Sequence, residues 1–263
     1  MKQLLFLLLP LFVYSKIYYA KVEPYESVVL KSAVSGLVLD ANLGLEGQLV
    51  EAHKIIHIDD RLDKINLEDS MKSVRLLEKM VHLNETIAES LKSTVLRQKG
   101  YYHRISKLST ASKTQKDTAY NSYASANTQY LTTQEKIVSL EKQLIDLRYK
   151  VAMLRDTIAK KSIVLEKKYL YKLMVRKGDF VTLGTPLATI QEIGRAKLVL
   201  FLEPEVLDAI EQKAVYLNGK KTAYHVNKVW QVADEKFISS YRAEIYIEAP
   251  QKRFSQLMKV ELK

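Results

Sequence analysis

The middle of this chain lacks the residues that most often end helices. No proline stands between Pro24 and Pro186, and Gly100 is the only glycine between Gly47 and Gly178. Because proline breaks helices and glycine commonly terminates them, this gap favours long, uninterrupted helices. Hydrophobic residues make up 47% of the 263 residues, enough to bury a core. We therefore expect a long helical region flanked by segments of another kind.

Apolar residues in this region recur at alternating spacings of three and four, the pattern of a coiled-coil seam. In residues 119–158 only Thr133 interrupts the apolar series. A weaker series runs through residues 67–105, where the polar Asn84 and Gln98 are interpreted as residues that fix the register. Each half of the region therefore predicts one helix with one apolar seam.

Neither seam continues through residues 109–112, whose sequence is Ser-Thr-Ala-Ser. Serine and threonine commonly cap the start of a helix, so a new helix is predicted to begin there. The prediction is an antiparallel coiled-coil hairpin over residues 61–160, with two helices of about 45 residues and a length of roughly 70 Å. A single continuous helix is the alternative. It would leave both seams exposed, whereas a hairpin buries each seam against the other.

Short strand-like segments with glycine turns flank the hairpin, in residues 21–60 and again in residues 161–194. The two flanking segments resemble each other, with Gly47 aligned to Gly178, Val50 to Val181 and Ile56 to Leu187. Each segment has too few strands to bury a face alone. They are therefore predicted to pair into one β domain that the hairpin interrupts.

Residues 195–263 contain further short apolar segments and one short helix that begins at Pro204. Five or six short strands with one helix predict a small β-barrel. The predicted fold class is therefore α+β, with a long helical hairpin inserted in a split β domain and a small β-barrel after it.

Residues 1–20 have the pattern of a secretory signal peptide. A single positive charge at Lys2 precedes about ten apolar residues, too few for a membrane span of roughly 20. Cleavage after Ser15 and cleavage after Ala20 are both considered, and an uncleaved anchor or a buried N-terminal strand is the alternative. Export to the periplasm is the prediction.

Composition excludes several classes of function. The chain has no cysteine, which excludes disulfides, thiolate metal sites and cysteine nucleophiles. No Ser/His/Asp arrangement or phosphate loop is present, so neither an enzyme nor a cofactor is expected. His53, His57 and Asp59 would share one face of a strand, but His53 and His57 would lie about 13 Å apart, too far for one ion. We expect no metal site.

The chain carries a net charge of +11, which favours a negatively charged partner. Residues 90–116 contain several bases and no acid, and the hairpin places them at its distal end. An acidic rim on a protein partner is one interpretation. A solvated basic face is another, and nucleic acid is a third that the export signal argues against. The bases are Lys92, Arg97, Lys99, Arg104, Lys107, Lys113 and Lys116.

Residues 118–134, just after the predicted tip, carry no charge. Tyr120, Tyr123 and Tyr130 could anchor lateral contacts between copies of the chain, since tyrosine is common in interfaces. Packing inside the hairpin is the alternative for the same residues.

This order of segments resembles the periplasmic adaptor (membrane fusion protein) family, the HlyD-like group that includes the adaptors of RND efflux systems. The stretch Gly178-Asp-Phe-Val181-Thr-Leu-Gly184 is similar to the family's second lipoyl half. Arg104, Leu108 and Ser112 resemble the Arg, Leu and Ser of the family's hairpin tip. The resemblance does not extend to a full membrane-proximal domain, because the sequence ends directly after the predicted barrel.

The resemblance implies a non-catalytic subunit of a tripartite efflux system, without a cofactor. Its partners would be an inner-membrane transporter, here of the resistance-nodulation-division (RND) type, and an outer-membrane channel of the TolC type. The copies would form a ring, a hexamer if the family pattern holds. Arg104, Leu108 and Ser112 would dock on the channel, supported by Lys99, Lys107 and Lys113. The alternative is an exported coiled-coil scaffold or chaperone that binds envelope proteins.

Overall fold

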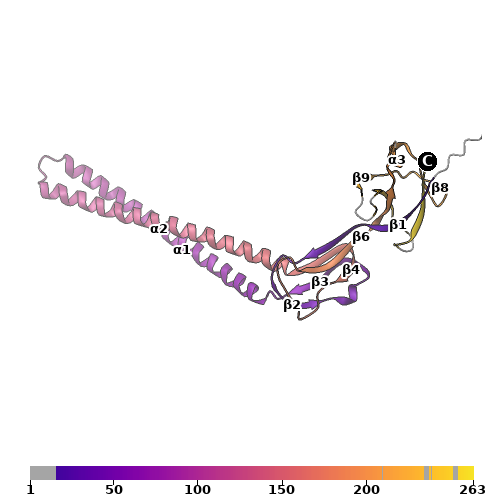
Figure 1. The fold of residues 1–263 in the computed structure, drawn as a ribbon. Coiled ribbons are helices and arrows are strands. Elements are labelled where there is room, and N and C mark those ends of the chain that lie inside the picture. The colour runs from indigo at the N-terminus through magenta and orange to yellow at the C-terminus, as the bar shows by residue number, and fades with distance from the viewer. Residues whose placement is uncertain (1–15, 209, 234–236, 238, 251–253) are drawn as a thin grey trace, which may run out of the picture. The chain divides into compact units, whose positions relative to one another are not determined.

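A computed structural model describes residues 16–208, 210–233, 237, 239–250 and 254–263. The chain forms two compact units, one of which comprises residues 34–39 and 56–163 and holds the helical hairpin. The other unit is built of strands from the remaining described residues. A long hairpin with an antiparallel sheet confirms the predicted α+β class (Figure 1).

The hairpin consists of α1 (Arg61–Lys107) and α2 (Lys113–Lys160), which confirms the break predicted at residues 109–112. The residues that α2 buries belong to the predicted seam, and they are Ala119, Ala126, Ile137, Leu140, Leu144 and Val151. Asn84 is also buried in the seam, where its amide nitrogen donates to the Met80 carbonyl of the same helix at 2.7 Å. Neither described helix has a stretch long and apolar enough to cross a membrane.

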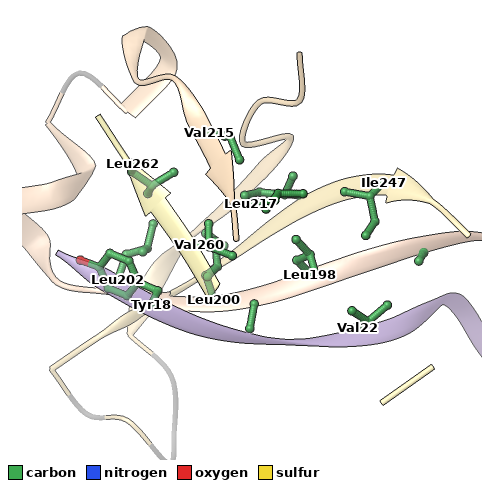
Figure 2. Close-up of a cluster of buried hydrophobic side chains, with 14 residues drawn as sticks. Tyr18, Val22, Leu198, Leu200, Leu202, Val215, Leu217, Ile247, Val260 and Leu262 are labelled. Atoms are coloured by element: carbon green, nitrogen blue, oxygen red, sulfur yellow. The ribbon is translucent and has the colours of Figure 1, made fainter. Parts of the chain in front are cut away.

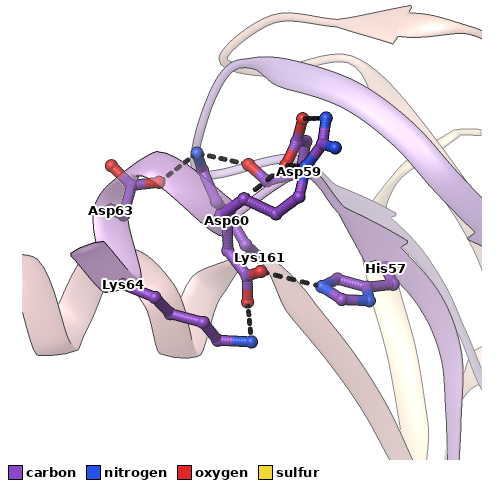
Figure 3. Close-up of polar contacts among 7 residues, drawn as sticks. His57, Asp59, Asp60, Asp63, Lys64 and Lys161 are labelled. Carbon is purple, nitrogen blue, oxygen red and sulfur yellow. Dashed lines mark hydrogen bonds and ion pairs between the residues drawn. The ribbon is translucent and has the colours of Figure 1, made fainter.

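Charged side chains fix the base of the hairpin, where the strand before α1 meets the end of α2 (Figure 3). Lys161 donates to the Asp59 carbonyl at 2.7 Å and pairs with the Asp63 carboxylate. Asp60 is buried, with Lys64 Nζ at 2.9 Å and His57 Nε2 at 3.3 Å from its carboxylate oxygens. Burial alone would raise the pKa of Asp60, but the bonds from Lys64 and His57 outweigh it and lower this pKa.

The strands of the other unit form an antiparallel sheet around two long strands, β1 (Ile17–Lys31) and β6 (Pro186–Leu202), which pair along most of their length. Beside them lie β4 (Ser162–Leu173) on β6 and β11 (Leu257–Leu262) on β1. The remaining elements before β6 are β2 (Gly36–Ala41), η1 (Leu43–Leu45), β3 (Gln48–Ile58) and β5 (Phe180–Val181). After β6 come α3 (Pro204–Leu207), η2 (Ile210–Gln212), β7 (Val215–Leu217), β8 (Lys220–Lys221), β9 (Lys228–Ala233) and β10 (Tyr241–Glu248).

The segments on either side of the hairpin pair as expected. Gly47 donates its backbone N–H to Leu170, and Ser32 accepts from Gly184, each at 2.8 Å. Gly47 and Gly178, aligned in the sequence, both have positive φ angles, 75° and 96°, a conformation that favours glycine. The aligned apolar residues Val50, Val181, Ile56 and Leu187 are all buried.

The C-terminal strands do not close into the predicted barrel. Their described pairings run β9-β10-β6-β1-β11-β7-β8, and no pairing joins β8 to β9. The predicted strand at residues 224–230 begins only at Lys228, because residues 222–227 are irregular. Tyr224 and Val226 from this segment pack against the core, although the segment adds no strand to the sheet. The sheet is therefore open, and its core includes Val22, Leu198, Leu200, Val215 and Val260 (Figure 2).

The described chain already forms a strand before residue 21, the predicted start of the mature domain. Residues 17–21 of β1 pair with β11, and Tyr18 and Ala20 belong to the buried core. The Tyr18 hydroxyl donates to the Glu203 carboxylate at 2.9 Å, and burial together with this bond raises the pKa of Tyr18. Residues 1–15 of the predicted signal peptide lie outside the described residues.

Candidate docking site at the hairpin tip

A short turn between the two long helices forms the tip. Helix α1 ends at Lys107, and Leu108 takes an extended conformation with φ −76° and ψ 123°. The N–H of Leu108 still bonds to the Ile105 carbonyl at 3.2 Å, which closes the last turn. The Leu108 side chain is 49% exposed, although a leucine gains free energy by burial. The turn therefore presents an apolar side chain to solvent at the distal end.

Ser112 begins α2 through a capping box. Its hydroxyl accepts from the Gln115 N–H at 3.2 Å, and the Gln115 side chain accepts from the Ser112 N–H at 2.8 Å. These bonds satisfy two backbone donors that a helix start otherwise leaves free. Ser112, predicted as a docking residue, thus has a structural role within its own chain.

We expect Ser112→Ala to lower the stability of the hairpin by about 1 kcal/mol, because it removes the cap acceptor. Ser112→Asn, which can still cap, should leave the melting temperature close to that of the unsubstituted chain. Thermal unfolding followed by far-UV circular dichroism measures both. Equal melting temperatures for the two variants would show that the capping box contributes nothing.

The predicted basic residues gather around this turn. Arg104 and Lys107 lie in the last turn of α1, where positive charge is favourable next to the negative end of the helix dipole. Lys113 is the first residue of α2, whose first turn contains no acid, and positive charge is unfavourable there. Among the described residues, Lys99, Arg104, Lys107 and Lys113 have no ion-pair partner. The helix dipoles therefore favour the positive charges of Arg104 and Lys107, but not the positive charge of Lys113.

A groove of about 500 Å³ runs along the end of α1. Ile105 and Leu108 give it apolar walls, and Arg104 and Lys107 line it with positive charge. Tyr101 and His103 complete the groove, although the sequence did not mark them as docking residues. Tyr101 precedes Arg104 by three residues and His103 precedes Lys107 by four, spacings that place each pair side by side on a helix. This spacing is the signal that could have identified Tyr101 and His103.

Two of the tyrosines after the tip, Tyr120 and Tyr123, contact Tyr102 on the other helix. The Tyr102 ring lies edge-on to Tyr120 at 5.5 Å and stacks on Tyr123 at 6.4 Å between centroids. Tyr120 is still 51% exposed, and Tyr130 is half-buried. This cluster therefore joins α1 to α2 below the tip.

The two histidines that the sequence analysis considered for a metal site lie in different environments. His57 faces Asp60 at the base of the hairpin, and His53 is exposed on β3. The described residues contain no group of three or more His, Asp or Glu side chains arranged to hold a metal ion.

No protein-family model matches the sequence, and no curated protein matches it at a significant level. Solved structures are similar in fold. MacA from Actinobacillus actinomycetemcomitans aligns with 95% of this chain and 78% of its own, with a TM-score of 0.74 and 11% identity. The membrane fusion protein Spr0693 from Streptococcus pneumoniae aligns with 95% of this chain and 99% of its own, with a TM-score of 0.58 and 12% identity.

A third similar structure is a MacA–MexA chimera that contains the α-hairpin domain of Pseudomonas aeruginosa MexA. It aligns with 95% of this chain and 78% of its own, with a TM-score of 0.52 and 16% identity. At these sequence identities the comparison shows that the folds are similar, and nothing more.

Proposed function

The chain has the fold of the membrane fusion, or periplasmic adaptor, proteins, and we propose that it is a non-catalytic adaptor subunit of a tripartite efflux system. It would link an inner-membrane transporter of the RND type to an outer-membrane channel of the TolC type. The observation that carries this proposal is the composition of the tip, where an exposed leucine lies among bases without ion-pair partners in the described chain.

The tip is suited to an acidic, partly apolar partner surface. Lys113 lies at the positive end of α2, so a carboxylate on a partner would relieve an unfavourable interaction and would also meet the free N–H groups of the first turn. The groove beside Arg104 and Leu108 offers apolar surface for the centre of such a contact. The bases around it would attract the partner at long range and orient it.

The proposed assembly is a ring of copies, a hexamer in the family pattern, with its tips against the channel. The chain would act by connecting and sealing the conduit, without a chemical step. An exported scaffold or chaperone remains the second candidate, because the same exposed basic tip could bind other envelope proteins.

We propose export to the periplasm with cleavage after Ser15. Cleavage after Ala20 would remove Tyr18 and Ala20 from the core and delete most of the β1–β11 pairing. Edman sequencing of the mature protein should therefore begin at Lys16. A mature N-terminus at Lys21 would contradict this assignment, and an intact Met1 would contradict signal cleavage itself.

The absence of natural cysteines allows a direct test of the docking site. Leu108→Cys places a thiol at the tip, and Leu62→Cys places one at an exposed leucine near the start of α1. After crosslinking in living cells, Leu108→Cys should capture an outer-membrane channel and Leu62→Cys should not. Capture of soluble envelope proteins alone from Leu108→Cys would favour the scaffold function and reject the adaptor.

A further inference from the structure

Helix α1 carries a second apolar stripe outside the seam. Its four residues are spaced by four, three and four positions and are between 43% and 63% exposed; they are Leu76, Met80, Leu83 and Ile87. Such spacings place side chains on one face of a helix, as in a coiled-coil seam. This stripe therefore has the pattern of a seam that is not covered within the chain. We call these four residues the α1 stripe.

Helix α2 carries a matching apolar column. Leu131, Val138 and Ile145 are separated by seven residues each, so they occupy one heptad position. They are 55%, 63% and 66% exposed. Because apolar side chains gain free energy when they leave water, a contiguous exposed row of them is typical of a surface that another protein covers. We call these three residues the α2 stripe.

The two stripes lie on opposite sides of the hairpin. Glu78 and Arg148, which pair at 2.7 Å, both occupy heptad position e, and their pair marks one side of the seam. Met80 and Ile87 occupy position g, which borders the other side of the seam. Ile145 precedes Arg148 by three residues and therefore lies beside it on α2. The α1 stripe is thus on the g side, and the α2 stripe is on the e side.

The stripes also lie at the same height along the hairpin. Counted from the Glu78–Arg148 ion pair towards the tip, Met80 is two residues away on α1 and Ile145 is three residues away on α2. Ile87 and Val138 are nine and ten residues away from the same pair. A second copy that points its tip in the same direction can therefore bring its α2 stripe against the α1 stripe of the first without sliding along the hairpin.

The side that carries the α1 stripe is basic. Lys136 and Lys150 of α2 occupy position g, and no g position in residues 73–94 of α1 or 129–150 of α2 holds an acid. Lys79 follows Leu76 by three residues and precedes Leu83 by four, so it borders the α1 stripe. None of these three lysines has an ion-pair partner in the part of the chain that the structure describes.

The side that carries the α2 stripe is acidic at this height. Val138 lines a groove of about 570 Å³ together with Glu85, Glu89 and Glu141, and the groove contains one base, Lys92. Glu141 lies three residues after Val138, so it borders the α2 stripe. Within the described residues, Glu89 and Glu141 have no ion-pair partner. The two sides of the hairpin are therefore complementary in charge as well as in apolar surface.

From these features we infer that copies of the chain pack side by side with their tips in the same direction, the α2 stripe of one copy against the α1 stripe of the next. The inference rests on the proposed adaptor function, because it names the surfaces by which the proposed ring would form. Each copy presents different surfaces to its two neighbours, and such head-to-tail contacts generate a ring when the rotation closes. Bases beside the α1 stripe meet glutamates of the next copy, which favours this contact over one between like sides.

Two cysteines in one chain test the contact. Full-length protein with Met80→Cys and Ile145→Cys should form disulfide-linked multimers larger than a dimer under mild oxidation, because each copy then carries both halves of the contact. The two thiols cannot join within one chain, since they lie on opposite sides of the hairpin. Each single variant should give few multimers, and a mixture of the two single variants should stop at the dimer.

The matched control replaces Ile145→Cys by Asp146→Cys in the double variant. Asp146 is also exposed and lies at nearly the same height, but it points about 100° away around α2. The control should therefore give far fewer multimers. Equal multimer yields from the Met80/Ile145 and Met80/Asp146 variants, or none from the Met80/Ile145 variant, would overturn the contact.

Two substitutions of one exposed residue test the role of charge on cysteine-free protein. Leu83→Glu and Leu83→Lys both remove an apolar side chain from the α1 stripe, and both residues are good helix formers. Leu83→Glu should weaken self-association about ten-fold in sedimentation measurements, because its carboxylate would also face the glutamates of the next copy. Leu83→Lys should weaken it less. Equal effects would reject the charge complementarity, and no effect would reject the α1 stripe as an interface.

The outcomes separate this contact from the proposed function. Capture of a channel from Leu108→Cys without multimers of the Met80/Ile145 variant would reject only the side-by-side contact. Multimers without channel capture would reject the adaptor function and leave the contact standing.

Discussion

Transport should be abolished when Arg104→Glu and Leu108→Asp are combined, while the hairpin stays folded. Both side chains are exposed at the tip, so neither change disturbs a packed core. Glutamate at position 104 opposes the negative end of the α1 dipole, at a cost of about 0.3–1 kcal/mol. Against an acidic partner the two changes replace attraction by repulsion and remove the apolar contact, so docking should be lost.

The measurement is efflux in cells that depend on this chain, together with far-UV circular dichroism of the purified variant. The matched control combines Lys79→Glu with Leu76→Asp, which makes similar changes at exposed positions of α1 far from the tip. The control should retain transport. Full transport by the Arg104/Leu108 variant would remove the tip from the mechanism, and loss in both variants would point to a general effect of charge on the hairpin.

Leu140→Asp should have the largest effect on stability. Leu140 is 5% exposed in the α1–α2 seam, so aspartate would place an unpaired carboxylate in an apolar environment. An uncompensated buried charge costs about 3–5 kcal/mol, enough to unfold a marginally stable hairpin. Helical content at neutral pH should therefore fall sharply.

Leu131→Asp is the control for this prediction, because Leu131 is 55% exposed on the same helix. It should leave the circular dichroism spectrum and the denaturant midpoint almost unchanged. Part of the helical signal of Leu140→Asp should return at low pH, where the carboxyl becomes neutral and its burial costs less. Equal denaturant midpoints for the two variants would contradict the assignment of the seam.

The hairpin and its capped turn could be predicted because their signals are local. A seam residue such as Leu140 is recognised by apolar neighbours three and four positions away, which one helix brings to one face. Ser112 was predicted within a capping segment, and its hydroxyl caps a residue only three positions later. The pair Gly47 and Gly178 was also accessible, because each glycine meets a conformational need of its own turn.

The sequence was a weaker guide where contacts join distant segments. Residues 17–20 were assigned to a signal peptide, yet their sequence is equally compatible with a strand. Only their pairing with β11 decides that Tyr18 and Ala20 lie in the core. The barrel prediction was wrong for a related reason. Strand propensity does not specify which strand edges pair, and part of the strand expected at residues 224–230 is irregular and packs Tyr224 and Val226 against the core.

The sequence by itself determined that this chain contains two long helices with apolar seams, a capped turn between them, and a basic segment without acids at that turn. Those properties depend on residues within a few positions of one another. The tertiary structure decided the open sheet, the core position of Tyr18 and the alignment of α1 with α2, in which Glu78 meets Arg148 across 70 positions of sequence. That alignment places Arg75 beside Arg148 and Glu89 beside Glu141, because the packing of one helix on another sets which charges share a face.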